Sequence, residues 1–330
     1  MKPDYKDALI LALDRGIAEP QGEWRIYNAV QLQDLMDDWK QVLKCEQSLR
    51  PEFIKLERVG YSVAPQFETN ENSSGAIILL GRNRKVNEAN IIRAWNTCDE
   101  GAQIIVAGDK TAGVGSSRKW VSGKTEIADS FSKHHAVVFW FMKKGDAWAE
   151  PDLTKEIDGY HLAEGMFSSD GPDKGSILLA EHFDKRLGGP VADLGSGWGY
   201  LSNELLKRNE KVTELALYEA DFHSLEAAKK NVQPYEGLAP SFHWCDLTTE
   251  FKKKPYQWVI MNPPFHSGRS AEPELGKKFI QVAGSTLPSG GRLLMVANRN
   301  LPYEDTLNKV FRNFKVLEER DGFKVIEAVK

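Results

Sequence analysis

Cysteine, long apolar runs and excess positive charge are all scarce in this chain of 330 residues. Its three cysteines, Cys45, Cys98 and Cys245, stand far apart and form no Cys-x-x-Cys pair. This spacing argues against a disulfide framework and a zinc site, and it favours a reducing, cytoplasmic location. The cysteine spacing also leads us to expect no bound metal. No apolar run approaches the roughly 20 residues of a membrane span, so we expect no membrane association. The apolar stretch 8–13 has acidic neighbours and no basic lead, which argues against a secretory signal.

The charge balance bounds the partners. The formal net charge is −4, and neither half of the chain has more Lys and Arg than Asp and Glu. This excludes a uniformly basic nucleic-acid binder, so any affinity for RNA must come from local patches. The candidate patches are Arg82–Lys85, Arg118–Lys119 with Lys124, and Lys252–Lys254. A solvated loop explains each patch as well as an RNA contact does.

Two domains are expected from the length. The charged segment from Lys143 to about Asp158 has no clear periodicity and is interpreted as a linker between domains at residues 1–150 and 160–330. Residues 8–13 and 176–181 match at an offset of 168, and later apolar segments recur in the same order. We therefore predict a duplication; the alternative is two unrelated α/β domains with similar apolar strands.

The second half shows the pattern of a doubly wound sheet. Strand and helix signals alternate from residue 176 onward, which predicts parallel βαβ units. The last two strands are separated by Asp321-Gly322, a tight hairpin signal. This arrangement is associated with class I, Rossmann-like methyltransferases, so we predict an α/β fold with a seven-stranded, mostly parallel sheet. The first half, which lacks the glycines and the proline turn described below, is expected to be a degenerate methyltransferase-like α/β domain.

A glycine loop, Asp193-Leu194-Gly195-Ser196-Gly197-Trp198-Gly199, follows the first strand of that half. A dinucleotide fingerprint requires G-x-G-x-x-G, and Tyr200 occupies the final position here. The loop instead suits the amino-acid end of S-adenosylmethionine, with an acidic residue at each of the next strand ends for the ribose and the adenine. Such carboxylates also often cap the next helix. The residues predicted to bind S-adenosylmethionine are Asp193, Gly195, Ser196, Gly197, Glu219, Ala220, Asp246, Leu247 and Asn262.

A proline turn, Asn262-Pro263-Pro264-Phe265, follows the apolar run 258–261. Two successive prolines cannot donate ladder hydrogen bonds, so the chain must leave the sheet here. The Asn262 side-chain oxygen and the Pro263 carbonyl can accept from the N–H groups of a planar amine, and Phe265 can stack on its ring. The predicted catalytic residues are Asn262, Pro263, Pro264 and Phe265. With the glycine loop, this turn indicates methyl transfer to a nitrogen.

Three further features keep two interpretations each. The turn-rich segment 165–175 carries Phe167 and either lies over the cofactor cleft or caps the helix at Ser176. Tyr303 either lines the substrate entrance or belongs to a structural turn. His266, next to the proline turn, is expected to orient a neighbour rather than to act as a base.

The second half resembles the ribosomal RNA guanine-N2 methyltransferases of the small-subunit methyltransferase C and large-subunit methyltransferase G type. The resemblance implies S-adenosylmethionine-dependent methylation of one guanine amine, with ribosomal RNA or a ribosomal subunit as the partner. A base in structured RNA must be splayed out to reach such a pocket. It also implies a degenerate methyltransferase-like N-terminal domain that serves as a scaffold or binds RNA. The segments that carry it are 165–168, 173–176, 193–199, 262–266, 297–303 and 322–325.

The proline turn by itself leaves the acceptor open. The same turn occurs in adenine-N6 methyltransferases and in glutamine methyltransferases that act on release factors. A third alternative is an RNA-binding assembly module that holds the cofactor without turnover. A monomer is compatible with the sequence, which leaves the oligomeric state open.

Overall fold

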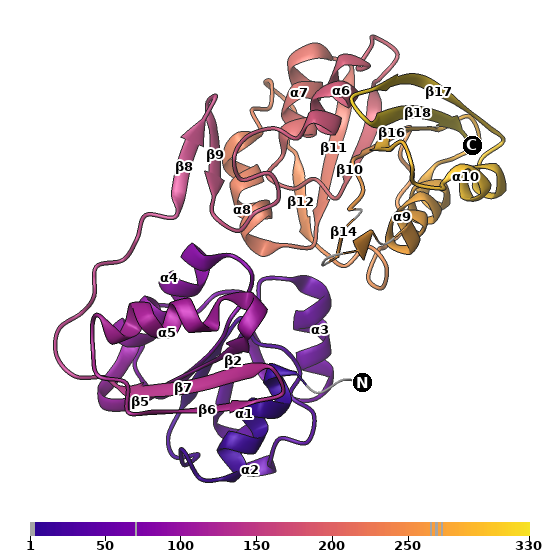
Figure 1. Ribbon diagram of the computed structural model, residues 1–330. Helices are drawn as coiled ribbons and strands as arrows, with labels where there is room; N and C mark the ends of the chain where they lie inside the picture. Colours follow the sequence, from indigo (N-terminus) through magenta and orange to yellow (C-terminus); the bar gives the residue numbers. More distant parts are fainter. Residues whose placement is uncertain (1–3, 70, 265, 268–269, 272) are drawn as a thin grey trace. The chain divides into compact units, whose positions relative to one another are not determined.

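The computed structural model describes residues 4–69, 71–264, 266–267, 270–271 and 273–330. The chain divides into two compact units, Met1–Leu153 and Thr154–Lys330. Within the described residues, none of the helices has the length and apolar character that crossing a membrane requires. Figure 1 shows the helices and strands of both units and labels them where there is room.

The first unit is built on a seven-stranded sheet in the order β3-β2-β1-β4-β5-β7-β6. Its strands are parallel up to β5, and the last two run antiparallel to their neighbours. The elements in chain order are α1 (Tyr5–Asp14), β1 (Trp24–Tyr27), α2 (Asp37–Val42), β2 (Leu43–Glu46), α3 (Arg50–Arg58), β3 (Ser62–Ala64), β4 (Ser73–Leu79), α4 (Arg84–Thr97), β5 (Cys98–Asp109), the short 3₁₀ helix η1 (Lys110–Ala112), α5 (Val114–Ser122), β6 (Asp129–Lys133) and β7 (Ala136–Met142).

The second unit opens with a hairpin and continues into a second seven-stranded sheet, in the order β12-β11-β10-β13-β16-β18-β17. Its elements are β8 (Thr154–Ile157), β9 (Tyr160–Ala163), α6 (Lys174–Glu181), β10 (Gly189–Leu194), α7 (Tyr200–Arg208), β11 (Val212–Glu219), α8 (Phe222–Asn231), β12 (Ser241–Trp244), β13 (Trp258–Met261), β14 (His266–Ser267), β15 (Ser270–Ala271), α9 (Pro273–Thr286), β16 (Arg292–Asn298), α10 (Glu304–Val310), β17 (Asn313–Arg320) and β18 (Phe323–Val329).

The two large sheets have the same strand order and the same antiparallel ending. The helices also match: α1 to α5 alternate with the strands of the first sheet as α6 to α10 do in the second. A chance likeness of apolar strands would not reproduce a complete element order. The shared order is the outcome that the predicted duplication requires, and the predicted mostly parallel α/β fold with a hairpin ending is confirmed.

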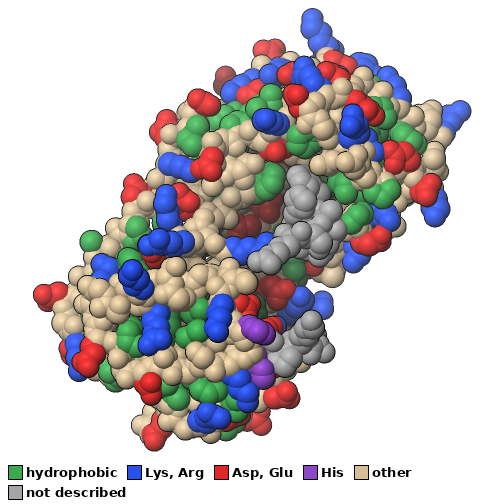
Figure 2. Space-filling view, in the orientation of Figure 1, with side chains coloured by type: hydrophobic (Ala, Val, Ile, Leu, Met, Phe, Trp, Pro, Cys, Tyr) green, Lys and Arg blue, Asp and Glu red, His purple; other side chains and the backbone are tan. Residues whose placement is uncertain are grey.

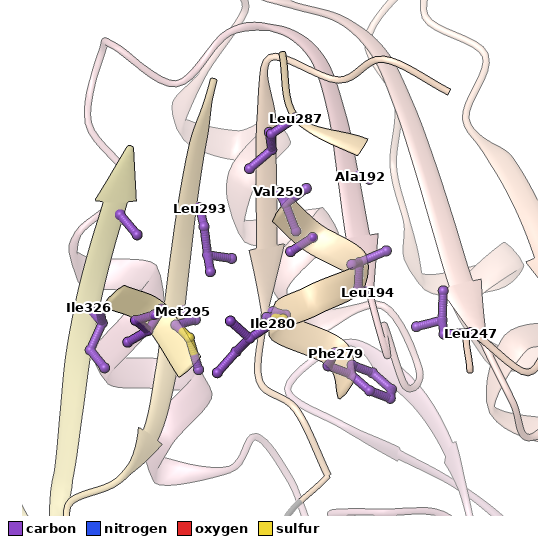
Figure 3. Close-up of a cluster of buried hydrophobic side chains, with 14 of the residues drawn as sticks. Ala192, Leu194, Leu247, Val259, Phe279, Ile280, Leu287, Leu293, Met295 and Ile326 are labelled. Atoms are coloured by element: carbon purple, nitrogen blue, oxygen red, sulfur yellow. The ribbon is translucent and has the colours of Figure 1, made fainter. Parts of the chain in front are cut away.

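Each sheet is buried between two layers of helices, because both of its faces are apolar. In the second unit, side chains of α6, α7 and α8 join the cluster on one face, and those of α9 and α10 join the cluster on the other. Figure 3 shows the second cluster, in which Phe279 and Ile280 of α9 lie beside sheet residues such as Val259 and Leu293. This packing holds the strand ends in register, and the strand ends carry the site.

The segment that was interpreted as a linker has more structure than its composition predicts. Trp148 stacks on Trp95 of α4 with ring centroids 4.2 Å apart, and its backbone pairs with the Asn96 side chain. Further on, β8 and β9 form an antiparallel hairpin, with Asp158 and Gly159 both at positive φ. This Asp-Gly turn is the hairpin signal that was recognised only at Asp321-Gly322.

Candidate functional site

The glycine loop after β10 has a backbone that only glycine adopts easily. Gly195, Gly197 and Gly199 have φ values of 75°, 55° and 89°. A Cβ added at Gly199 would lie 2.8 Å from Val232, whereas one at Gly197 would meet no described atom within 4 Å. Gly199 therefore serves packing of α7 against α8. Gly197 leaves its backbone open to close approach by a ligand.

Asp193, the penultimate residue of β10, lies fully buried beneath this loop. Its Oδ2 accepts a hydrogen bond from the Ser202 hydroxyl at 2.7 Å, and its Oδ1 has no partner among the described residues. Burial, opposed by the Ser202 hydrogen bond and aided by the nearby Glu219 charge, raises the pKa of Asp193 to about 7. A buried acceptor without a donor fits the cationic end of a ligand.

Glu219, the last residue of β11, fastens the glycine loop. One carboxylate oxygen accepts from the Gly197 amide at 2.7 Å, and the other accepts from the amides of Ala220 and Asp221. Burial raises the pKa of this carboxyl, and the three amide hydrogen bonds oppose that shift. The structure thus places Glu219 against the loop; its bond to a ribose remains a prediction.

Asp246 follows β12 and caps the turn after it. Its carboxylate accepts from the backbone and hydroxyl of Thr248 and from the hydroxyl of Thr249, all at 2.8 Å. Leu247 is buried in the core cluster below. Asp246 therefore caps a turn rather than a helix, because the next described element after β12 is the strand β13, and contact of Asp246 or Leu247 with adenine remains a prediction.

Asn262 leaves β13 with its amide group fixed by two side chains. Its Nδ2 donates to Asp173 Oδ2 at 3.0 Å and to Ser176 Oγ at 2.9 Å. Asp173 is the N-cap of α6, and the same oxygen accepts from the amides of Gly175 and Ser176. Pro263 is buried and Pro264 is exposed, whereas Phe265 lies outside the described residues. No described residue donates to Asn262 Oδ1.

The glycine loop and the proline turn meet in one pocket. The glycine loop lines it with Gly195, Ser196 and Gly197. Further lining residues are Asn262, Asp173 and Ser176. Asp193, Glu219, Ala220, Asp246 and Leu247 are not among its lining residues and lie at the ends of neighbouring strands or just after them. The structure therefore brings four of the predicted residues into direct contact with the pocket.

The turn-rich segment before α6 does both things that the sequence allowed. Asp173 caps the helix, and Phe167 lines the pocket with 57% of its surface exposed. Trp198 of the glycine loop donates its indole N–H to the Phe167 carbonyl at 3.1 Å, which anchors the segment beside the pocket. Tyr303, by contrast, is fully buried with its hydroxyl against Gly276 of α9, so the structural interpretation of that tyrosine is correct. The side chain of His266 lies outside the described residues.

Sequence reasoning missed the contact partners of the central residues. The sequence patterns indicate no role in the site for Asp173, Ser176 or Ser202 beyond the start of a helix at residues 173–176. Asp173 and Asn262 are 89 positions apart in the sequence, and Ser202 lies nine positions after Asp193. The capping Asp before α6 was the available signal, because a Ser/Thr/Asp/Asn before an apolar period marks a helix start.

The pocket residues fit the amino-acid end of S-adenosylmethionine. Ser196 Oγ is buried without a partner among the described residues, as Asp193 Oδ1 is. Both atoms belong to the glycine loop or the residue that supports it, and Gly197 leaves open space beside them. Buried polar atoms of this kind ordinarily find a partner, so a polar ligand at the loop would satisfy them.

Comparison with known proteins gives the family. The methyltransferase small domain family matches residues 160–327. Ribosomal RNA small subunit methyltransferase C of Photorhabdus laumondii is 30% identical over 242 residues, covering 72% of this chain and 70% of the relative. The enzyme of the same name from Psychromonas ingrahamii is 30% identical over 69% of this chain and 68% of its own. The solved 16S rRNA N2 G1207 methyltransferase of T. thermophilus, in complex with AdoMet and guanosine, shares the fold with a TM-score of 0.80 and 23% identity, covering 99% of this chain and 91% of that one.

Proposed function

The chain belongs to the ribosomal RNA small subunit methyltransferase C family, and we propose that it methylates the exocyclic N2 amine of a guanine in ribosomal RNA. The relative solved with AdoMet and guanosine has the same fold across both units, which supports this acceptor. The single observation that carries the proposal is that Asn262 and the glycine loop line one pocket. The pocket thus joins the residues that can hold an amine to those that can hold a methyl donor.

Asn262 and Pro263 act on the acceptor. The exocyclic amine of a base is a poor nucleophile because its lone pair is delocalised into the ring. Hydrogen bonds from its N–H groups to Asn262 Oδ1 and to the Pro263 carbonyl favour pyramidalisation and direct the lone pair. These bonds strengthen as positive charge develops on nitrogen, so they stabilise the transition state more than the bound substrate. Phe265 is proposed to stack on the base, worth about 1–3 kcal/mol.

The cofactor residues act by positioning. S-adenosylmethionine supplies the sulfonium methyl group when it is bound. Gly195, Ser196 and Gly197 would hold its amino-acid end, and Asp193 would accept from the ammonium. The proposed ribose ligand is Glu219, supported by Ala220, and the proposed adenine contacts are Asp246 and Leu247. Holding two reactants in line removes much of the entropic barrier.

The first unit, residues 1–150 in the proposed division, is assigned a scaffold or RNA-gripping role beside the catalytic domain at 160–330. Arg118, Lys119 and Lys124 are exposed on and after α5 and supply cations for phosphates. In the face shown in Figure 2, basic and acidic side chains are interspersed, so such contacts would be local. The proposed site of action is the cytoplasm, where ribosomal subunits are found.

Transfer of labelled methyl groups to undermethylated ribosomal RNA, followed by nucleoside analysis, tests the proposal. We expect the label in N2-methylguanosine. Label on adenine or on protein glutamine would assign the chain to another nitrogen acceptor. Tight cofactor binding without any transfer, to either naked RNA or assembled subunits, would identify an assembly module instead.

A further inference from the structure

We propose that Asp173 and Ser176 are positioning residues that lock the Asn262 amide so that only its oxygen faces the acceptor amine. This inference rests on the proposed function, because it concerns the same Asn262 side chain. Asp173, Ser176 and Asn262 are called the amide clasp below. The clasp joins the first turn of α6 to the end of β13, across 89 residues of sequence.

The contacts of the clasp use every N–H of the Asn262 side chain. One goes to Asp173 Oδ2 at 3.0 Å and the other to Ser176 Oγ at 2.9 Å. An amide NH2 carries only two hydrogens, so no donor remains to face the pocket. The free group is Oδ1, on a half-buried side chain that lines the pocket.

The chemistry of Asp173 makes this orientation the favoured one. A carboxylate can only accept hydrogen bonds, so a flipped Asn262 would aim its carbonyl oxygen at Asp173 Oδ2. The flip would lose the hydrogen bond to Asp173 and set two acceptor oxygens against each other, whereas the Ser176 hydroxyl can accept from the amide NH2 or donate to its oxygen, so Asp173 decides the orientation. Asp173 cannot turn away easily, because the same oxygen accepts from the amides of Gly175 and Ser176 at 3.0 and 3.2 Å. Gly175 admits this arrangement, since a Cβ there would lie 3.0 Å from that oxygen and 2.9 Å from Phe323.

The clasp therefore sets the polarity of the pocket. An unclasped asparagine can present either its NH2 or its oxygen, and only the oxygen can accept from an exocyclic amine. Fixing the orientation before the substrate binds means that no reorganisation is needed as charge develops on nitrogen. The substrate class that this polarity selects is a planar group whose NH2 enters edge-on as a donor.

Substitutions at position 173 separate positioning from helix capping. Serine caps a helix nearly as well as aspartate, but its shorter side chain does not extend to Asn262. We expect Asp173→Ser to reduce single-turnover methylation of undermethylated ribosomal RNA about 10- to 100-fold, the scale of a misplaced reactive group. The melting temperature and the S-adenosylmethionine dissociation constant should be unchanged. Asp173→Asn keeps an acceptor at full length and should restore most of the lost rate.

Ser176→Ala removes the second acceptor and should slow turnover about 3- to 10-fold, as expected for one neutral hydrogen bond. The matched control is Asp4→Ser. Asp4 caps α1, the counterpart of α6 in the first unit, through the Lys6 amide and contacts no asparagine of the pocket. Its replacement should leave the rate unchanged.

Asn262→Ala distinguishes failure of this inference from failure of the proposed function. If Asn262→Ala slows transfer but Asp173→Ser keeps the wild-type rate, the clasp is overturned and the function stands. If Asn262→Ala keeps the wild-type rate, the proposed role of the turn fails and the clasp fails with it. A rate loss in Asp173→Ser that follows its melting temperature, without recovery in Asp173→Asn, would also overturn positioning.

Discussion

The two units share one topology but treat their strand ends in opposite ways. In the second unit, the ends of β10 and β13 border an open pocket. In the first unit, the corresponding ends are filled by the protein's own side chains. The comparison shows that this sheet order needs no ligand at its carboxyl edge, provided that other residues satisfy the exposed backbone and charges there.

The second strand of each sheet ends in a glutamate, and the partners of the two glutamates differ. Glu219 accepts hydrogen bonds from three backbone amides, including that of Gly197. Glu46 is gripped by Arg93 of α4 through two guanidinium nitrogens at 2.8 and 2.5 Å. Arg93 also lies over the Tyr27 ring at 5.2 Å. Where the second unit can offer a carboxylate to a ligand, the first has neutralised it internally.

The first strand shows the same contrast. In both units the backbone leaves the first strand through a residue with positive φ, which is Gly195 in the second unit and Asn28 in the first. Asparagine tolerates this backbone, but its side chain then needs a partner, and it donates to the Leu79 carbonyl. Beside it, Asn87 pairs with both the amide and the carbonyl of Gly81, where the second unit has its proline turn. In the first unit, the side chains of Asn28 and Asn87 thus occupy hydrogen-bonding backbone groups at these strand ends.

Breaking the ion pair between Arg93 and Glu46 in the first unit should give the largest effect. Arg93→Ala leaves the Glu46 carboxylate, which is 6% exposed, without its cation, and we expect a loss of about 3–5 kcal/mol in the unfolding free energy of the first unit. Urea unfolding followed by tryptophan fluorescence measures it, since most tryptophans lie in this half. Lys55→Ala, which removes a surface pair with Glu52, is the control and should cost less than about 1 kcal/mol. Equal losses of unfolding free energy in the two variants would show that the buried Arg93–Glu46 pair stabilises the unit no more than a surface pair does.

Asn262 at the proline turn and Asn87 of α4 should differ in effect, because the first should control turnover and the second stability. Asn262→Ala should raise the methyl-transfer barrier by about 2–4 kcal/mol while leaving cofactor affinity nearly unchanged. Asn87→Ala removes the side chain of α4 that binds Gly81 at the matching turn of the first unit, and it should lower stability without changing turnover per folded molecule. Single-turnover rates at saturating cofactor give the comparison. A slow Asn87 variant with a normal Asn262 variant would reverse the assignment of the active unit.

The two glutamates should also separate. Glu219→Gln replaces an acceptor oxygen by a donor against backbone amides and should weaken S-adenosylmethionine binding by about 1.5–3 kcal/mol, roughly 10- to 100-fold. Titration calorimetry measures the dissociation constant. Glu46→Gln should leave it unaltered. Unchanged binding in the Glu219 variant would remove this residue from the cofactor site.

The smallest effect, when counted per pH unit, is a pH dependence of stability that arises from Asp193 of the second unit. The pKa of Asp193 rises from 3.8 to about 7 on folding, so the folded protein keeps this proton over a wider pH range. The resulting stability is complete below pH 3.8 and is lost as the pH rises through about 7. The slope is at most about 1.4 kcal/mol per pH unit. In Asp193→Asn this component should vanish, and a pH profile identical to wild type would contradict the buried carboxyl.

Local signals made much of this structure predictable. The Asp321-Gly322 hairpin, the glycine loop and the turn after β13 each depend on the conformational limits of one or two residues. These limits act whatever the rest of the chain does. Alternating apolar segments indicated where the strands and helices of the second unit lie, because a strand buried on both faces leaves a continuous apolar run.

Contacts between distant segments could not be predicted in this way. No pattern near Asn262 indicates that Asp173 holds it, because the two residues are 89 positions apart in the sequence and meet only in the folded chain. The carboxylate of Asp246 could serve a ligand or a turn, and its surroundings place it on Thr248 and Thr249. The Arg93–Glu46 ion pair could not be predicted either, because the sequence around a helical arginine does not indicate its partner.

The hairpin β8–β9 has a practical consequence for dividing the chain. Asn231 bridges the backbone of His161 in β9 and the Trp198 carbonyl in the glycine loop, so the hairpin braces that loop. The family match begins at residue 160, after β8 has ended. A fragment cut there would leave β9 as an unprotected edge prone to self-association. Expression of the second unit alone should therefore start before Thr154.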